Sequence, residues 1–213
     1  MFTRRAQLDL FAPYDLPLVN IAAVCDCRDF VAPAKRAGLP PFALLLHGIG
    51  RASLEVEEFR WRLEGGEPVR IDALTMSYTM VGADGHLTFS TFAFDADRET
   101  FLARYLEDRE AARAAAAGDL RLQPLQGRGY LFTTCLPWLR FTQIQHPVAK
   151  AADCSIPSVA VGQFDQAGGR VSFPLAVQAH HGLVDGIHVA RYMARLSEIM
   201  DETAAVLAGD GWC

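Results

Sequence analysis

The chain has 213 residues, of which 51% are hydrophobic and 21% charged, and its formal net charge is -5. This length and apolar content are those of an ordinary globular core, so we expect a single domain over residues 1–213. The acidic balance offers no basic surface for a phosphate backbone, and we therefore expect no nucleic-acid partner.

The sequence also gives no support for export or membrane insertion. No apolar run approaches the roughly 20 residues that a membrane span needs, and MFTRRAQLDLF lacks the apolar centre of a signal peptide. We expect a cytoplasmic protein whose five cysteines are reduced thiols. Cys25 and Cys27 lie on one side of an extended segment, but no second pair with ligand spacing completes a metal site, so we expect half-buried strand cysteines and no metal.

The first half of the chain alternates strand and helix patterns. Residues 19–27 are rich in β-branched types and predict a strand, and residues 30–38 predict a short helix or loop. The stretch PFALLLHGIGRASLEV after Pro40 predicts a buried helix. A hairpin around Gly65-Gly66 leads into a further strand, and LTFSTFAF, with aromatic groups on both faces, predicts a strand in the middle of a sheet.

The second half begins with a predicted helix over residues 97–117. The stretches FTTCLPWLRFTQI and SIPSVAVGQF predict two strands interrupted by prolines, and residues 170–179 predict another after a Gly-Gly turn. Apolar residues at helical spacing from Val189 to Leu207 predict a final helix. The irregular order of elements favours an α+β fold, a two-layer sandwich in which helices cover a mixed sheet.

The segment PLAVQAHHGLVDGIHVARYM carries the chemistry. It passes from a predicted strand into the last helix through a turn with His180, His181, Asp185 and Gly186. A neutral imidazole at a strand end can take the proton of a hydroxyl as an acyl carbon is attacked, which is worth about 10²- to 10⁴-fold in rate. Two hydrogen-bonded core histidines beside a helix cap are the structural alternative, but the fixed spacing of Asp and Gly favours a catalytic site.

The motif HHGLVDG fits the His-His-x-x-x-Asp-Gly signature of the chloramphenicol acetyltransferase superfamily, which includes dihydrolipoyl acyltransferases and condensation domains. The segments PPFALLLHGIGRAS, EEFRWRLEGGEPVRIDALTMSYTMV, CLPWLRFT and GGRVSFPLAVQAHH resemble further family segments, in one register over residues 2–199. The length is similar to that of chloramphenicol acetyltransferase, whereas the relatives carry additional modules or a second half. The resemblance therefore implies the chloramphenicol acetyltransferase fold and an acetyl-CoA-dependent O-acetyltransferase, with a role in antibiotic resistance.

The resemblance also implies roles for individual residues. His181 would be the base, acting directly on the hydroxyl of a small-molecule acceptor in a ternary complex with acetyl-CoA. Asp185 would pair with an N-terminal arginine, for which Arg4 is the first candidate and Arg5 the second. Gly186 would let the chain turn into the helix.

The other two histidines of the segment are given structural roles. His180 would form a structural hydrogen bond, and His188 would pack in the first turn of the helix. The family forms homotrimers with interfacial active sites, so His181 would face a pocket of the neighbouring subunit. The aromatic residues available to line this pocket are Tyr78, Phe89, Phe92, Phe94, Tyr130, Phe132 and Trp138, although core packing explains each one singly.

Two positions near the expected reaction centre depart from the family pattern. In the comparison with the family, Arg140 takes the place of a serine that stabilises the oxyanion, and Ala160 takes the place of a threonine near bound water. Loss of one such donor costs about 10²- to 10³-fold in rate. Arg140 either replaces the donor electrostatically or fills the pocket, and Thr142 is the nearest remaining hydroxyl.

Three hypotheses follow. The first is an O-acetyltransferase of the chloramphenicol type. The second keeps the fold and the base but has a different acceptor, with Arg140 recognising an anionic group or the oxyanion. The third is a non-catalytic acyl-CoA-binding trimer.

Overall fold

The computed structural model describes residues 1–82, 85–116, 118–148 and 154–209. Its main sheet has the strand order β1-β9-β7-β6-β4-β5, and β8 pairs with β9. The strands of this sheet are β1 (Leu18–Arg28), β4 (Thr75–Val81), β5 (Leu87–Ala93), β6 (Tyr130–Cys135), β7 (Ser158–Val161), β8 (Asp165–Ala167) and β9 (Arg170–His180). β6 is parallel to β4 and β7, and the other pairs are antiparallel, so the sheet is mixed.

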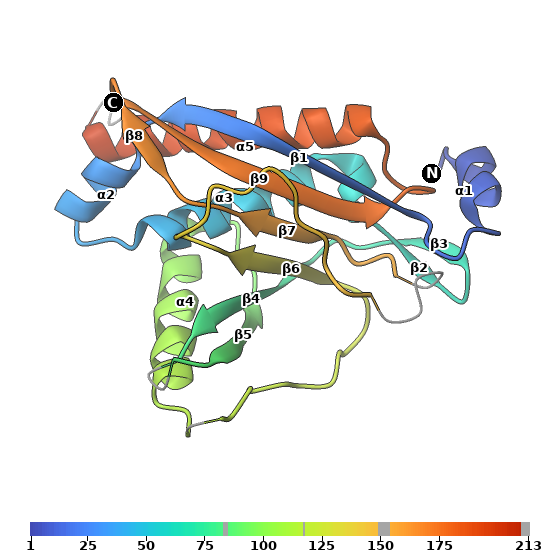
Figure 1. The fold of residues 1–213 in the computed structure, drawn as a ribbon, viewed down its shortest axis with the longest axis horizontal. Coiled ribbons are helices and arrows are strands. Elements are labelled where there is room, and N and C mark those ends of the chain that lie inside the picture. The colour runs from blue at the N-terminus through green and yellow to red at the C-terminus, as the bar shows by residue number, and fades with distance from the viewer. Residues whose placement is uncertain (83–84, 117, 149–153, 210–213) are drawn as a thin grey trace.

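Helices cover one face of this sheet. α3 (Pro41–Glu55) and α5 (Gly186–Ala208) lie behind it in Figure 1, and α4 (Arg98–Arg113) stands against β5. The shorter elements are α1 (Arg5–Phe11), α2 (Val31–Arg36), the 3₁₀ helix η1 (Glu57–Arg60) and the hairpin of β2 (Trp61–Glu64) and β3 (Glu67–Arg70). The predicted α+β fold, with a mixed sheet covered by helices, is confirmed.

The β1–β9 ladder carries the chain to the histidine motif. Its register runs from Arg28 opposite Arg170 to Leu18 opposite His180, so β9 ends immediately before His181. Residues 175–180 of β9 are all buried, because α5 and α3 cover one face and residues 139–148 cross the other (Figure 1). Burial on both faces explains why this stretch of β9 reads as nearly continuous apolar sequence.

α3 is held close to its neighbours by glycines. At Gly50 an added Cβ would overlap the ring of Phe94, and at Gly48 it would lie 2.9 Å from the sulfur of Met200 in α5. The helix begins after Pro40, a residue type that suits a helix start because its missing N–H needs no partner there. The helix predicted from PFALLLHGIGRASLEV is therefore confirmed, and its glycines are contact points.

The β2–β3 hairpin is fixed to the sheet by a buried arginine. Arg62 is fully buried, and its guanidinium donates hydrogen bonds to the carbonyls of Phe59, Trp61, Arg128 and Tyr130. Because four carbonyls surround the group, its desolvation is offset by hydrogen bonds. The predicted hairpin is confirmed and connects to the start of β6.

Several predictions need correction. The LTFSTFAF strand is β5, which lies at an edge of the described sheet and not in its middle. It has aromatic groups on both faces because Phe92 packs against α4 while Phe89 faces a cavity. The fourth helix ends at Arg113, before the alanine run. The strand predicted to continue after Pro137 stops at Cys135, and α1, η1 and β8 had no prediction. Cys25, Cys27, Cys135 and Cys154 are free thiols, and Cys213 lies outside the described residues.

Candidate active site

The histidine motif forms a tight turn between β9 and α5. The backbone N–H of His181 donates to the carbonyl of Pro17 at 2.8 Å, and both Leu183 and Val184 donate to the carbonyl of His180 at 2.9 Å. The turn is thus anchored on one side to the chain entering β1 and on the other to the last residue of β9. A side chain on it is positioned by the sheet.

The ring of His181 is held in one orientation. Its Nδ1 lies 3.2 Å from the carbonyl oxygen of Val184 and 3.2 Å from Oδ1 of Asp185. Both partners only accept hydrogen bonds, so the proton of the neutral ring is on Nδ1 and the lone pair is on Nε2. Phe11 of α1 stacks on the ring with a centroid distance of 4.0 Å. With the side chain 32% exposed, His181 has the geometry of a base accessible from outside the turn.

An ion pair ties the N-terminal segment to this turn. Nη1 of Arg4 lies 2.7 Å from Oδ2 of Asp185, and Nη2 is 3.5 Å from the carbonyl of His181. The hydrogen bond and charge of Arg4 hold the pKa of Asp185 below its usual value, against the effect of burial. The structure brings Arg4, the first candidate, to Asp185. The second candidate, Arg5, points elsewhere and binds Glu67 at 2.5 Å.

The two neighbouring histidines have hydrogen-bond partners of their own. Nδ1 of His180 accepts from the N–H of Gly182 at 3.1 Å, and burial lowers the pKa of His180 to about 4. Nδ1 of His188 accepts from the N–H of Asp185 at 2.9 Å, and its Nε2 faces Glu58 at 3.3 Å. His188 therefore caps the start of α5, a more specific arrangement than the packing we expected.

The glycines of the motif differ in what they permit. A Cβ on Gly182 would lie 2.9 Å from both Cα and Cδ1 of Leu8, so the absence of a side chain lets α1 dock on the turn. Gly186 is the first residue of α5 and lies outside the left-handed region, and a Cβ there would make an ordinary contact of 3.6 Å with Ile21. The structure gives no support to the tight-turn role expected for Gly186.

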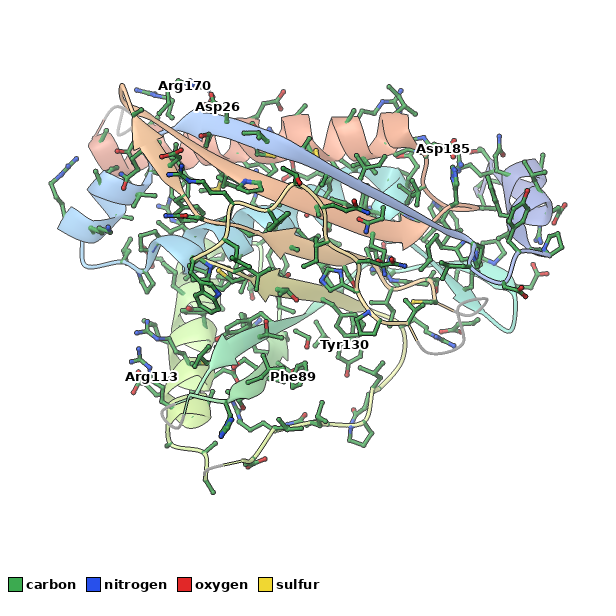
Figure 2. The ribbon with its side chains drawn as sticks, in the orientation of Figure 1. Asp26, Phe89, Arg113, Tyr130, Arg170 and Asp185 are labelled. Carbon is green, nitrogen blue, oxygen red and sulfur yellow. The ribbon has the colours of Figure 1, made fainter. Side chains whose placement is uncertain are left out.

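A cavity of about 430 Å³ lies on the sheet face away from α3 and α5. Its lining residues come from β4, β5, β6 and β7 and from the two connections beside them: Ser77, Tyr78, Thr79, Phe89, Thr91, Arg121, Leu122, Gln123, Leu125, Tyr130, Phe132, Thr133, Thr134, His146, Pro147 and Ser158. We call it the first cavity. Figure 2 shows Phe89 and Tyr130 beneath β6, far from Asp185 beside α1, so the first cavity does not contain the His181 turn of its own chain.

A second cavity adjoins the first, and a third adjoins the second. The second, of about 380 Å³, shares Tyr78, Thr79 and Thr134 with the first, and the third, of about 380 Å³, shares Phe42, Cys135 and Pro137 with the second. Thr134 on β6 lies where the first two meet. Thr134 pairs with Ala160 of β7 in the sheet register. Its hydroxyl therefore lies beside the position at which the family pattern has a threonine.

The structure separates Arg140 and Thr142 from these cavities. Arg140 is exposed and pairs with Asp165 at 3.1 Å, and with Thr142 it lines a smaller pocket beside Phe173 and Pro174. Pro174 and His181 are seven positions apart along β9 and its end, about 23 Å at the usual rise of a strand. Within one chain, Arg140 and Thr142 therefore lie far from His181, and they line neither of the cavities that meet at Thr134.

Sequence reasoning missed three residues of this arrangement. Phe11 and Gly182 were not singled out, because contact between α1 and the turn joins parts of the chain that no local pattern relates. Thr134 carried a signal, since FTTC places hydroxyls immediately before the Pro-Trp segment that the resemblance used. Among the described residues, no cluster of three His, Cys, Asp or Glu side chains is arranged to hold a metal ion.

Comparisons with known proteins agree with this geometry. The family model described as chloramphenicol acetyltransferase matches residues 2–197. The chain belongs to this family. Chloramphenicol acetyltransferase 2 of Escherichia coli is 30% identical over 165 residues, 75% of each chain, and chloramphenicol acetyltransferase 3 of the same organism is 29% identical over 163 residues, 74% of each. A Proteus mirabilis chloramphenicol acetyltransferase is 27% identical over 93% of this chain and 91% of its own.

Solved structures show the same fold. A chloramphenicol acetyltransferase superposes with a TM-score of 0.80 and 23% identity, covering 93% of this chain and 95% of its own. A dihydrolipoamide acetyltransferase of Azotobacter vinelandii has a TM-score of 0.66 and 20% identity over 95% of this chain and 88% of its own. The chain is therefore an acyltransferase with the fold of the chloramphenicol acetyltransferase family. None of its described helices combines the length and apolarity that a membrane span requires.

Proposed function

We propose that this chloramphenicol acetyltransferase family member transfers the acetyl group of acetyl-CoA to the hydroxyl of a small-molecule acceptor, with His181 as the general base. The observation that carries the proposal is the orientation of the His181 ring. Val184 and Asp185 both accept from Nδ1, which leaves the lone pair of Nε2 free and exposed. General-base catalysis through Nε2 requires this tautomer, because Nε2 must carry the lone pair.

The reaction balances with one base. Nε2 of His181 takes the hydroxyl proton while the acceptor oxygen attacks the thioester carbonyl carbon. The tetrahedral oxyanion then collapses, the carbon–sulfur bond breaks, and the imidazolium returns the proton to the departing sulfur. The products are an acetyl ester and free CoA thiol, and no covalent bond to the enzyme forms. Asp185, paired with Arg4, keeps Nδ1 protonated throughout.

Thr134 is our proposed donor to the oxyanion. It stands between the first and second cavities and next to Ala160 in the strand register. An acceptor in the first cavity and a thioester in the second would meet at its hydroxyl. A donor aimed at developing charge in a site without water is worth about 10²- to 10³-fold in rate. We keep Arg140 as the weaker candidate, since Asp165 neutralises it at the surface.

The second and third cavities fit the acetyl-CoA donor. They share a wall and form a connected path lined by apolar side chains such as Trp138 and Phe164, and Lys35 lines the third cavity. An apolar path suits the long uncharged arm of a thioester donor, and a cation suits its phosphates. These residues would bind and orient the donor, which supplies the activated acyl group.

We further propose a homotrimer whose active sites form between subunits, as the family resemblance implies. In one chain, His181 is not among the residues that line the first cavity, and its side chain is 32% exposed. A neighbour that brings its first cavity to His181 would complete the site. The single-domain organisation over residues 1–213 also stays a prediction.

The proposal is tested by following CoA thiol release from acetyl-CoA with purified protein, with chloramphenicol and then a panel of neutral alcohols. His181→Ala removes the base, and His86→Ala removes an exposed histidine outside these cavities as a matched control. We expect acceptor-dependent release that is lost by at least about 10²-fold in His181→Ala alone. Equal rates in the two variants would remove His181 from the mechanism.

The two alternatives make different predictions. An acceptor with an anionic group that Arg140 recognises would show activity that is lost in Arg140→Ser. A non-catalytic acyl-CoA-binding protein would bind acetyl-CoA without releasing thiol with any acceptor. The ion pair of Arg140 with Asp165, outside the three cavities, favours neither alternative over a neutral acceptor.

A further inference from the structure

One side chain in the wall of the first cavity is left without partners. Both ring nitrogens of His146 are buried, and neither has a hydrogen-bond partner within the described part of the chain. Burial lowers the pKa of His146, so near neutral pH its ring is uncharged and has one donor and one acceptor nitrogen. Buried polar groups in folded proteins are almost always satisfied, and an exception needs an explanation.

The backbone that carries this ring is fixed by side chains from β9 and β1. Oε1 of the buried Gln178 on β9 accepts from the N–H of His146 at 3.1 Å, and Nε2 donates to its carbonyl at 3.4 Å. Two residues earlier, the carbonyl of Ile144 accepts from the side chain of Asn20 on β1. The backbone on both sides of Gln145 is therefore anchored to the sheet, which places the ring of His146 in the cavity wall.

The rest of the cavity is apolar or neutral. Side chains with apolar bodies dominate its wall: Phe89, Leu122, Leu125, Tyr130 and Phe132. The guanidinium of Arg121 also lines it, but Asp108 neutralises this charge at 3.0 Å. Such a wall suits a molecule with an aromatic or aliphatic body and no charge.

We propose that His146 selects the acceptor: the first cavity takes a neutral alcohol that carries a second hydroxyl or an amide, and this second group hydrogen-bonds to the His146 ring. The proposal rests on the proposed function in taking this cavity as the acceptor site. Hydroxyl and amide groups both donate and accept, so they satisfy either ring nitrogen. A site with a buried hydrogen-bonding group rejects an analogue that lacks the partner far more strongly than an apolar pocket rejects an extra group.

The test compares matched alcohols that differ by one hydroxyl. Dissociation constants are measured by ligand-observed NMR for phenethyl alcohol against styrene glycol, and for hydrocinnamyl alcohol against its vicinal diol. The proteins are the unmodified chain, His146→Leu, His146→Asn and, as control, His86→Leu. We expect the unmodified chain to bind each diol about tenfold more tightly than its partner, equivalent to about 1.4 kcal/mol.

The variants separate recognition from structural support. In His146→Leu the preference for the diol disappears while the mono-alcohol binds as before, His146→Asn keeps part of the preference, and His86→Leu keeps all of it. A diol should also shift the ring nitrogen signal that is missing from the spectrum of His146→Leu. Equal preference in the unmodified chain and His146→Leu would overturn the inference. So would the absence of any preference, or of any binding, in the unmodified chain.

Binding and turnover fail separately. A protein that prefers the diol through His146 and releases no CoA thiol retains this inference and loses the proposed function. If the protein releases CoA thiol and His146→Leu leaves the diol preference unchanged, the proposed function is retained and this inference is lost.

Discussion

The carbonyl of Val184 and the carboxylate of Asp185 orient the ring of His181, and Asp185 is paired with Arg4, an arginine far away in the sequence. Asp185 accepts from Nδ1 of His181 and is itself paired with Arg4. In the proposed mechanism this pair positions His181, and a small displacement of a catalytic group costs up to about 10²-fold in rate. Its loss should lower turnover without removing the base.

We expect Arg4→Met to reduce thiol release by about ten- to a hundredfold. The neighbouring Arg5→Met is the matched control, since Arg5 pairs with the exposed Glu67 away from the turn. Steady-state kinetics with a saturating acceptor measures the effect as a change in kcat. Equal kcat values for the two variants would show that the ion pair does not position His181.

The buried His180 makes stability depend on pH. Burial lowers its pKa from 6.5 to about 4, so the unfolded chain binds the proton more readily than the folded one. Stability from this residue is therefore complete above pH 6.5 and is lost as the pH falls towards 4. The gap between the two pKa values corresponds to at most about 3 kcal/mol.

Urea unfolding at several pH values between about 6.5 and 4 checks this expectation. His180→Asn retains an acceptor for the Gly182 N–H and cannot titrate in this range. We expect the free energy of unfolding to fall less steeply with decreasing pH in the variant. Parallel curves for the two proteins would assign the pH dependence to other groups.

At the residue scale the sequence was most informative where the chemistry is local. The turn from His180 to Gly186 is contiguous, so its spacing could predict a site. The assignment of Arg140 to the oxyanion position rests on a short match around the Pro-Trp segment and stays a prediction. The pairing of Thr134 with Ala160 could not be predicted, because strand register is not visible from a single stretch of sequence.

Glycines allow helix α3 to pack closely against its neighbours. The close approach of Gly50 to Phe94 means that a methyl group would have to push an aromatic ring out of a packed core. We expect Gly50→Ala to lower the free energy of unfolding by about 1–3 kcal/mol, although alanine favours the helix by up to about 1 kcal/mol.

A double-mutant cycle isolates the contact from the propensity. Phe94→Leu shortens the opposing side chain, and we expect the two changes together to cost less than the sum of each alone, with a coupling of about 1 kcal/mol. Urea unfolding of the four proteins supplies the values. Strict additivity would mean that Gly50 is not limited by Phe94.

Most elements were predictable from local sequence: apolar residues at helical spacing indicated α5, and continuous apolar or β-branched stretches indicated α3, β1 and β9. The errors lie where tertiary contacts decide. β5 has apolar residues on both faces although it ends the described sheet, since one face packs on α4 and the other lines a cavity. α1 is short and partly exposed, and Leu8 is its one buried residue. A single buried residue produces no apolar periodicity, so the sequence does not predict this helix.

At the scale of the whole molecule, the two parts of the proposed site, His181 and the first cavity, lie far apart in one chain. This separation is testable. In a trimer, His181 of one subunit would serve the first cavity of the next. His181→Ala removes the proposed base. Thr91 of β5 lines the first cavity, so Thr91→Trp should fill it. When the two inactive variants are coexpressed and assemble at random, about one quarter of the interfaces join an intact base to an intact cavity.

We expect thiol release from the mixture to reach about a quarter of the unmodified rate. Light scattering on the same samples checks that trimers have formed, and each variant expressed alone serves as control. Mixed trimers that stay inactive would place the base and the cavity of one site in the same chain.

The long β1–β9 ladder has a consequence during synthesis on the ribosome. Cys27 and Val171 face each other in the ladder although 144 positions separate them in the chain. At about 5–20 residues per second, β1 waits on the order of ten seconds before its partner strand is made. For that time an eleven-residue, β-branched strand has unpaired hydrogen-bonding edges. We therefore expect the yield of soluble protein to depend on chaperones that shield nascent chains. Slower translation should lower this yield, because it lengthens the time for which β1 is unpaired.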